Sequence, residues 1–418
     1  MDVFKVVGGA ELAGEVRVPG AKNAVLPILA ACILSDKPVQ LTNCPQITDV
    51  DNMIAILKQA GCAVEENGDS LSVDASAAAC CEMPQELSSK LRSSIFMLGP
   101  MIARFGRASF CHPGGCEIGT RPIDLHLNGL RKLNVRIREE FGRIHCESDR
   151  LTGAQVHLDY PSVGATENVM MAAVRAEGVT TISNAAREPE IADLQAFLNA
   201  LGFCVSGAGS SSIVVRGGGM ARATRHRIMA DRIVAGTALC AAAITGGAVT
   251  VLDTDPRDVA SVTAKLAEAG CRITCGEAEV RLEAPRRLRE IPLIETLPYP
   301  GFPTDMQSLL FSLCCVADGT SVIIENVFES RFKTAAEMAK MGARCTVKDR
   351  TAIIRGVERL TAADVQAREL RGGAALTIAA LAADGESTVR GVEYIDRGYQ
   401  RLDGLLRALG ANIRRVRC

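Results

Sequence analysis

The sequence lacks a marked excess of charge of either sign. It contains 47 Lys and Arg residues and 48 Asp and Glu residues among 418, which gives a formal net charge of −1. Such a balance does not favour binding to nucleic acid or to an anionic membrane surface. Any anion that the protein binds is therefore expected to be held by a local cluster of Lys and Arg side chains.

Long apolar runs are also missing. No stretch approaches the ~18 uninterrupted apolar residues of a membrane span. The first twenty residues, MDVFKVVGGAELAGEVRVPG, contain no basic region followed by an apolar run, so no signal peptide is expected. The length and the hydrophobic content of 48% fit about two or three globular domains.

Metal-binding patterns are absent as well. The 16 cysteines never form a CxxC pair, and the five histidines do not accompany cysteines at zinc-ligand spacing. Several cysteines lie within apolar helical runs (Cys32, Cys240, Cys314 and Cys315). This usage is typical of buried, reduced thiols in a cytoplasmic protein, and no metal site is expected.

The sequence does contain one pattern repeated six times. Each copy has an apolar helix that ends near a Gly or Asn and is followed by two strands, and a further helix and strand precede it. The copies are about seventy residues apart, and their anchor positions are Gly61, Asn134, Gly202, Gly270, Gly342 and Gly410. Gly and Asn suit the residue after a helix, which often has a positive φ.

Three repeats precede residue 217 and three follow residue 230, separated by RGGGMARATRHRIMA, which we interpret as a hinge. The N-terminal segment VFKVVGGAELAGEVRV is expected to complete the sheet of the last domain. The sequence thus predicts an α/β fold with two similar domains, residues 22–229 and residues 1–21 with 230–418. A cleft between two such domains is the expected binding site.

Two helix starts are candidate anion sites because free backbone N–H groups and the helix dipole favour phosphate or carboxylate there. PGAKN places Lys22 and Asn23 at the first, and PSVGATEN places Ser162, Val163 and Gly164 at the second. Ordinary N-capping explains Ser162 equally well. A lysine at a positive helix end is unfavourable unless an anion lies beside it, which favours a functional role for Lys22.

Further candidates are charged residues at helix starts and turns. Arg92 begins a predicted helix in KLRSSIFMLGP, and Arg371 lies beside a glycine pair in ARELRGG. The proline-rich PYPGFPTDMQ brings Asp305 to a helix start, where a plain N-cap or first-turn acid is the alternative. YIDRGYQRL places Arg397 in a turn, where an arginine is often only a surface residue.

The stretch CHPGGCEIGTRPIDLH combines a cysteine, Cys116, with three nearby glycines and with Arg121 and Asp124. Such a loop can swing, open to admit substrates and closed to bring Cys116 and Arg121 over an anion. The alternative is a surface Ω-loop with an incidental cysteine.

Taken together, GGCxxGxRPxDLHL, PGAKNAVLPIL, SVGATEN, YPGFPTDMQ and IDRGYQRL resemble the UDP-N-acetylglucosamine 1-carboxyvinyltransferases, a family of enolpyruvyl transferases. The resemblance implies an inside-out α/β barrel of two domains, each with three repeated helix–strand units. It implies a cytoplasmic enzyme that transfers the enolpyruvyl group of phosphoenolpyruvate to UDP-N-acetylglucosamine, needs no cofactor and is alkylated by fosfomycin. No oligomeric state is predicted.

The resemblance also implies roles for particular residues. Lys22, Arg121 and Arg397 match phosphoenolpyruvate-binding positions, with Arg92 and Arg371 nearby. Cys116 matches the general acid, and Asp305 matches the base that deprotonates the sugar hydroxyl. The implied nucleotide-sugar contacts are Asn23, Arg92, Arg121, Pro122, Ile123, Asp124, Leu125, Ser162, Val163, Gly164, Asp305 and Val327. Arg331, Asp231 and Arg232 match other family positions without a separate role.

Two residues depart from the family pattern, and alternatives remain. Glu369 stands where Asp is usual before Leu-Arg, and Tyr160 stands where a basic residue is common near the diphosphate. The sister enzyme that acts on shikimate 3-phosphate shares the six-repeat fold, but it lacks the cysteine loop. A silent paralogue that only binds the nucleotide sugar, and a repeat scaffold without ligand, are the other readings.

Overall fold

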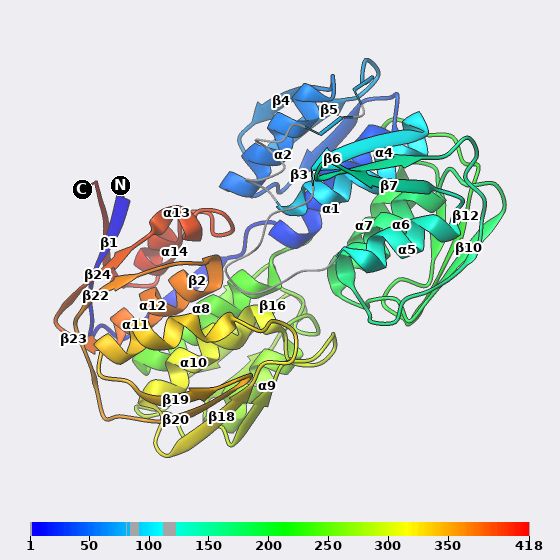
Figure 1. The fold of residues 1–418 in the computed structure, drawn as a ribbon. Helices are drawn as coiled ribbons and strands as arrows, with labels where there is room; N and C mark the ends of the chain where they lie inside the picture. Colours follow the sequence, from blue (N-terminus) through cyan, green and yellow to red (C-terminus); the bar gives the residue numbers. More distant parts are fainter. Residues whose placement is uncertain (1, 81, 84–91, 112–122, 418) are drawn as a thin grey trace. The chain divides into compact units, whose positions relative to one another are not determined.

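The structure, a computed structural model, describes residues 2–80, 82–83, 92–111 and 123–417. These residues form two compact units (Figure 1). We call residues 2–19 with 230–417 the C-terminal unit, and the described residues between 20 and 229 the N-terminal unit. No described helix is long and apolar enough to cross a membrane.

The described residues of the C-terminal unit form three four-stranded sheets with one common plan, in which a parallel pair of strands is extended by two antiparallel strands. In sheet order they are β2 (Ala13–Arg17), β14 (Ala248–Leu252), β16 (Glu279–Glu283) and β15 (Arg272–Cys275); β17 (Leu293–Glu295), β18 (Thr320–Ile324), β20 (Thr351–Arg355) and β19 (Arg344–Lys348); and β22 (Asp364–Gln366), β24 (Glu386–Arg390), β1 (Asp2–Val7) and β25 (Asn412–Arg417). β21 (Leu360–Thr361) and β23 (Ala383–Asp384) form a small additional pair.

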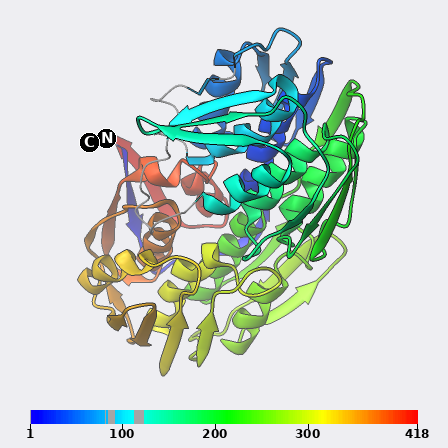
Figure 2. The ribbon, with the colours of Figure 1, turned by 45° about the vertical axis from the view of Figure 1, so that its right-hand side comes forward.

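The first strand of the N-terminal segment, β1, completes the last sheet, as predicted, whereas its second strand, β2, pairs with β14 in another sheet. β1 lies between β24 and β25, with Phe4 opposite Val389 on one side and Arg415 on the other. Figure 2 shows the two chain ends beside each other. The preceding repeats supply their own third strand, but the last repeat borrows it from the start of the chain.

Three helices form the interior of the C-terminal unit, α8 (Arg232–Thr245), α10 (Gln307–Val316) and α12 (Leu370–Leu381) (Figure 1). They are almost entirely apolar and buried, because the sheets enclose them on the outside. The shorter helices of this unit are α9 (Ala260–Glu268), η3 (Thr304–Met306), η4 (Arg331–Lys333), α11 (Thr334–Lys340), α13 (Val392–Ile395) and α14 (Leu402–Ala408).

The N-terminal unit repeats this plan. Its strands, in sheet order, are β13 (Thr224–Arg227), β3 (Val39–Thr42), β5 (Ser70–Asp74) and β4 (Ala63–Asn67); β9 (Gln155–His157), β10 (Val179–Ser183), β12 (Ser212–Arg216) and β11 (Cys204–Ser206); and β6 (Arg107–Cys111), β8 (Arg143–Glu147) and β7 (Arg136–Glu140). Its described helices are α1 (Lys22–Ala31), η1 (Cys32–Leu34), α2 (Thr48–Gln59), η2 (Arg92–Met97), α4 (Leu98–Phe105), α5 (Asp124–Lys132), α6 (Val163–Ala173) and α7 (Pro189–Ala200). The predicted α/β fold of repeated helix–strand units is confirmed.

The anchor of each repeat has the backbone conformation expected from its residue type. The φ values at Gly61, Asn134, Gly202, Gly270, Gly342 and Gly410 are 97°, 68°, 103°, 98°, 87° and 97°. All are positive and follow a helix, so these positions favour Gly or Asn.

The predicted hinge is wrong for part of its length. Residues 224–227 form β13, which pairs in parallel with β3. The side chain of His226 turns inward and its Nε2 lies 2.9 Å from Asp193 Oδ1. The segment is therefore an edge strand of the N-terminal unit, and its basic residues obscured the strand pattern.

Candidate functional site

Asp305 lies in η3, just before α10 in the C-terminal unit. Its carboxylate accepts hydrogen bonds from two arginines, at 2.8 Å from Arg331 Nη2 and 3.3 Å from Arg371 Nη2. Neither η3 nor α10 has a side-chain cap. Asp305 is therefore not an N-cap but a first-turn acid of η3, as one form of the alternative had it, and its carboxylate belongs to a cluster of charges.

Arg331 is 2% exposed and begins η4. Its Nη1 donates a hydrogen bond of 2.8 Å to the Thr304 hydroxyl, and its guanidinium lies 5.3 Å from the centre of the Phe328 ring. The residue thus joins η4 to η3, which carries Asp305.

Arg371 is equally buried, in the first turn of α12, with its guanidinium 5.1 Å from the centre of the Tyr399 ring. Burial by itself lowers the pKa of Arg371, but Tyr399, Asp305 and Asp231 outweigh it and raise the pKa above its usual value. Among the described residues, no hydrogen-bond partner contacts its Nε or Nη1. The site therefore holds a permanent buried cation with donors left over.

Carboxylates cap two of the three core helices of this unit, α8 and α12. Asp231 Oδ1 accepts hydrogen bonds from the backbone N–H groups of Ile233 and Val234 at 2.8 and 3.0 Å. Glu369 accepts from the backbone of Arg371, at 2.8 Å, and of Gly372. Both acids neutralise the positive helix start.

Three further predicted residues belong to this unit, namely Arg232, Val327 and Arg397. Arg232 is buried beside Tyr299, 5.6 Å from the ring centre. Val327 follows β18 and donates its backbone N–H to Glu325 at 2.8 Å. Arg397 is half-buried in the turn after α13.

In the N-terminal unit, Lys22 is the first residue of α1. Its Nζ lies 2.8 Å from Oδ2 of Asp49, a fully buried residue on α2. The negative charge expected beside this lysine is therefore present in the chain itself. Asn23 follows in the same turn and is half-buried.

Ser162 caps α6, since its Oγ accepts a hydrogen bond of 3.3 Å from the Ala165 N–H. The N-cap interpretation is therefore correct for its side chain. Val163 and Gly164 begin the helix, and a Cβ at Gly164 would lie 2.9 Å from Cε1 of His126. Glycine thus lets the start of α6 approach α5 closely.

The predicted segment 121–125 is described only in part. Ile123 is buried, Asp124 is exposed and begins α5, and Leu125 is half-buried. Cys116, Arg121 and Pro122 lie outside the described residues, as does the side chain of Arg92, whose backbone begins η2.

Comparisons with known proteins identify the family. A family model described as EPSP synthase (3-phosphoshikimate 1-carboxyvinyltransferase) matches residues 6–405. UDP-N-acetylglucosamine 1-carboxyvinyltransferase 2 of Caldanaerobacter subterraneus subsp. tengcongensis is 49% identical over 416 residues, which cover 100% of both chains. The UDP-N-acetylglucosamine 1-carboxyvinyltransferase of Serratia proteamaculans is 47% identical over 418 residues, again 100% of both.

The chain belongs to the UDP-N-acetylglucosamine 1-carboxyvinyltransferase family. Among solved structures, the enolpyruvyl transferase NikO from Streptomyces tendae has a TM-score of 0.87 and 27% identity over 99% of each chain. EPSP synthase from Acinetobacter baumannii has a TM-score of 0.77 at 19% identity over 100% of each chain, which shows the common fold.

The Glu369 departure from the family pattern has a structural account. The longer side chain still reaches the backbone N–H groups at the start of α12. The Glu369 carboxylate therefore caps α12. Tyr160, the second departure, is 43% exposed, and its carbonyl accepts a hydrogen bond from the Ser162 N–H.

Reasoning from the sequence missed three residues of these clusters, Asp49, Thr304 and Glu325. Asp49 is a first-turn acid of α2. Thr304 directly precedes Asp305, and Glu325 directly follows a strand. Only the last two have a signal in the sequence, namely their closeness to Asp305 and Val327.

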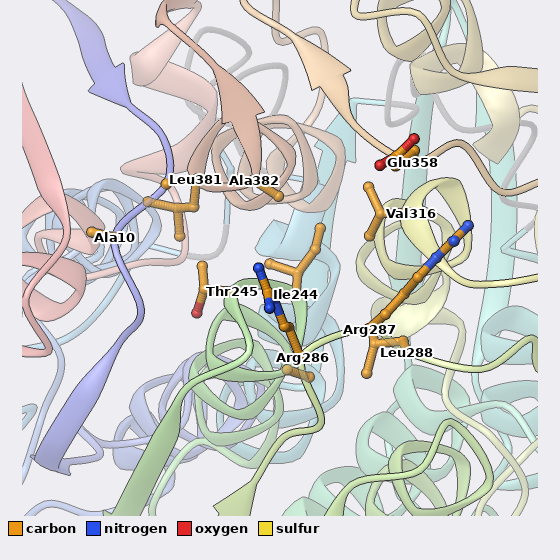
Figure 3. Close-up of a pocket in the computed structure, with 12 residues that line it drawn as sticks. Ala10, Ile244, Thr245, Arg286, Arg287, Leu288, Val316, Glu358, Leu381 and Ala382 are labelled. Carbon is orange, nitrogen blue, oxygen red and sulfur yellow. The ribbon is translucent and has the colours of Figure 1, made fainter.

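A cavity of about 150 Å³ lies away from these residues. It is lined by the C-terminal ends of α8, α10 and α12, whereas Asp231, Asp305 and Arg371 lie at the opposite ends of the same helices. Figure 3 shows Arg286 and Arg287 at its wall. This cavity is separate from the candidate site.

Proposed function

We propose that this chain transfers the enolpyruvyl group of phosphoenolpyruvate to the 3′-hydroxyl of UDP-N-acetylglucosamine and releases phosphate. One observation carries this proposal, the end-to-end identity of 49% and 47% to relatives named for this transfer. The reaction is the first committed step of peptidoglycan precursor synthesis. It takes place in the cytoplasm, which suits the free cysteines among the described residues.

Phosphoenolpyruvate carries a carboxylate and a phosphate, so several cations must gather around it. We assign this role to Lys22, Arg121 and Arg397, with Arg92 and Arg371 nearby. Support comes from Arg371, whose buried guanidinium has two nitrogen atoms without a hydrogen bond among the described residues. A planar guanidinium suits a bidentate contact with a carboxylate or phosphate.

The chemistry is an addition followed by an elimination. The sugar 3′-oxygen bonds to C2 of phosphoenolpyruvate while a proton reaches C3, which gives a tetrahedral phospholactoyl adduct. Loss of a C3 proton and of phosphate then restores the double bond. Cys116 supplies the C3 proton, since an ordinary thiol with a pKa of ~8.5 is protonated near neutrality. Asp305 accepts the hydroxyl proton. No metal or organic cofactor takes part.

We assign the contacts with the nucleotide sugar to particular residues. The uracil end contacts segment 121–125 and the diphosphate contacts Ser162 to Gly164, while Asn23, Asp305 and Val327 hold the sugar. Support comes from the close packing of Gly164 on His126, which brings α5 and α6 together. We further propose residues 22–229, and residues 1–21 with 230–418, as the two functional domains. The chain passes between the two compact units at residues 19/20 and 229/230, close to these proposed boundaries, which supports the division.

The decisive experiment measures phosphate release from phosphoenolpyruvate by the purified protein. We expect release only when UDP-N-acetylglucosamine is present, with the carboxyvinyl ether as second product in mass spectrometry. Release that depends on shikimate 3-phosphate would assign the chain to the sister reaction, which the matching family model names. Binding of the nucleotide sugar without turnover would indicate a silent paralogue.

Cys116 provides a second test of the assignment. We expect Cys116→Ser to depress turnover strongly and to leave binding of UDP-N-acetylglucosamine nearly unchanged. Fosfomycin, an epoxide that mimics phosphoenolpyruvate, should alkylate Cys116 in the wild-type protein. Peptide mapping by mass spectrometry locates the adduct, and modification of Cys111 instead would contradict the assignment.

A further inference from the structure

Glu325 is a fully buried carboxylate that follows β18. Four donors among the described residues point at it. Oε1 accepts from the Thr296 hydroxyl at 2.9 Å and from the backbone N–H groups of Val327 and Phe328 at 2.8 and 3.0 Å. Oε2 accepts from the Thr304 hydroxyl at 2.9 Å. A buried acid with this many donors is held in one orientation.

The Thr304 hydroxyl transmits this orientation toward Asp305. A hydroxyl has one hydrogen and two lone pairs, whereas a guanidinium only donates. Because Arg331 Nη1 donates to the Thr304 oxygen at 2.8 Å, the hydroxyl hydrogen must point to Glu325. Arg331 then uses Nη2 to hold Asp305 Oδ1 at 2.8 Å. The direction of each of these hydrogen bonds is thereby fixed.

The other oxygen of Glu325 holds the turn that contains Val327. Its bonds to two consecutive backbone N–H groups set the start of segment 327–328. One carboxylate therefore fixes two parts of the proposed site, the acid assigned as base and a residue assigned to the sugar.

We propose that Glu325 is a positioning residue that holds Asp305 and the Val327 turn in mutual register for the transfer. This inference rests on the proposed function. Glu325 acts through Thr304 and Arg331 on one side and through the backbone on the other, and it does not itself exchange a proton. Its loss should therefore reduce the fraction of complexes in which Asp305 is correctly aimed.

Glu325→Gln is the first test, because the amide keeps the shape of the side chain. If its oxygen stays at the Oε1 position, its NH₂ group faces Thr304, whose hydroxyl hydrogen then loses its acceptor. We expect kcat to fall about 10- to 100-fold, because small misplacements of catalytic groups reduce the rate by such factors. KM for phosphoenolpyruvate should change little, since none of the four donors to Glu325 belongs to an assigned cation.

Two threonine variants give a matched comparison. Thr304→Val and Thr296→Val each delete one hydroxyl that donates to Glu325. The Thr304 hydroxyl also accepts from Arg331, whereas the Thr296 hydroxyl accepts from the backbone N–H of Asn326. We expect Thr304→Val to lower kcat as Glu325→Gln does, Thr304→Ser to restore it, and Thr296→Val to keep kcat near the wild-type value. Thermal unfolding of each variant measures the structural cost separately.

The outcomes separate the two proposals. Equal kcat values for Thr304→Val and Thr296→Val, or an unchanged kcat in Glu325→Gln, would overturn the positioning role while the wild-type activity stands. If Glu325→Gln fails to fold, the threonine pair still decides. Wild-type protein without phosphate release dependent on UDP-N-acetylglucosamine would overturn the proposed function instead.

Discussion

The two units start their buried helices with different chemistry. In the C-terminal unit, carboxylates cap α8 and α12, through Asp231 and Glu369. In the N-terminal unit, α6 has the neutral cap Ser162, and α1 begins with Lys22 and has no side-chain cap. The repeat needs an apolar helix between sheets but does not dictate its first residue. Helix starts are therefore where a repeated fold can diverge toward binding.

The opposite ends of the helices differ too. In the N-terminal unit, Arg104 Nη1 donates to the carbonyl groups of Ile33 and Ser35, both at 2.7 Å, and Arg175 Nη2 donates to Leu34 at 2.9 Å. In the C-terminal unit, the C-terminal ends of α8, α10 and α12 line the cavity of Figure 3, where Arg286 is exposed. In the N-terminal unit, arginines therefore donate hydrogen bonds to the carbonyl groups at the helix ends, whereas in the C-terminal unit the helix ends line a cavity.

The largest effect should come from Asp305, the acid at a helix start that does not cap it. Asp305→Asn keeps the shape and removes the base, so kcat should fall about 10²- to 10⁴-fold. Binding of UDP-N-acetylglucosamine, measured by calorimetry, should weaken far less. Asp318→Asn, an exposed acid of the same unit, is the control. An unchanged kcat with weaker binding would make Asp305 only a sugar ligand.

The next effect concerns the buried pair of Lys22 and Asp49. Asp49→Asn removes a buried countercharge, so the free energy of unfolding should fall by about 3 kcal/mol. Asp51→Asn, exposed on the same helix, should cost little. Urea unfolding measures both. Adding Lys22→Met to Asp49→Asn should recover part of the loss, and strict additivity of the two changes would contradict a coupled pair.

Much of the fold could be predicted because it depends on local rules. Spacing of apolar helices revealed six repeats, and the anchors, such as Gly61 and Asn134, have the predicted positive φ. The sheet that β1 completes followed from the unfinished last repeat. These features rest on periodicity and backbone conformation, which are visible along the chain.

The site was predicted less completely because its pairs are not local. Lys22 and Asp49 come from different helices, and Arg371 and Asp305 are 66 residues apart. Ordinary sequence patterns indicate that a charge lies at a helix start, but not which charge faces it. For the same reason the contact of Glu325 with Thr304 was not predicted, and the segment that forms β13 was interpreted as part of a hinge.

A smaller effect on the free energy of unfolding should distinguish the C-terminal helix ends of the two units. Arg104→Met removes charged hydrogen bonds to two carbonyl groups and should cost about 2 kcal/mol of unfolding free energy. Arg286→Met, the matched change beside the cavity, should be nearly neutral because that side chain is exposed. Equal losses in denaturant unfolding would show that the two units close their helix ends alike.

The last effect differs from the others because it depends on pH, and it concerns Glu167 of α6. It is fully buried, and neither carboxylate oxygen has a hydrogen-bond partner among the described residues. Burial, followed by the charges of Glu190 and Glu188, raises its pKa well above 4.5. The folded protein therefore keeps a proton on Glu167 at pH values where the unfolded chain has released it.

The sign follows from proton counting. Above about pH 4.5 the unfolded state binds fewer protons than the folded state, so this group lowers stability as the pH rises, until the raised pKa is reached. Glu167→Gln cannot ionise, so its stability relative to wild type should increase with pH by up to about 1.4 kcal/mol per unit. Urea unfolding at pH 5 and pH 8 measures the difference, with the exposed Glu65→Gln as control. A difference that is the same at both pH values would mean that Glu167 is ionised in the folded protein, which its burial without partners opposes.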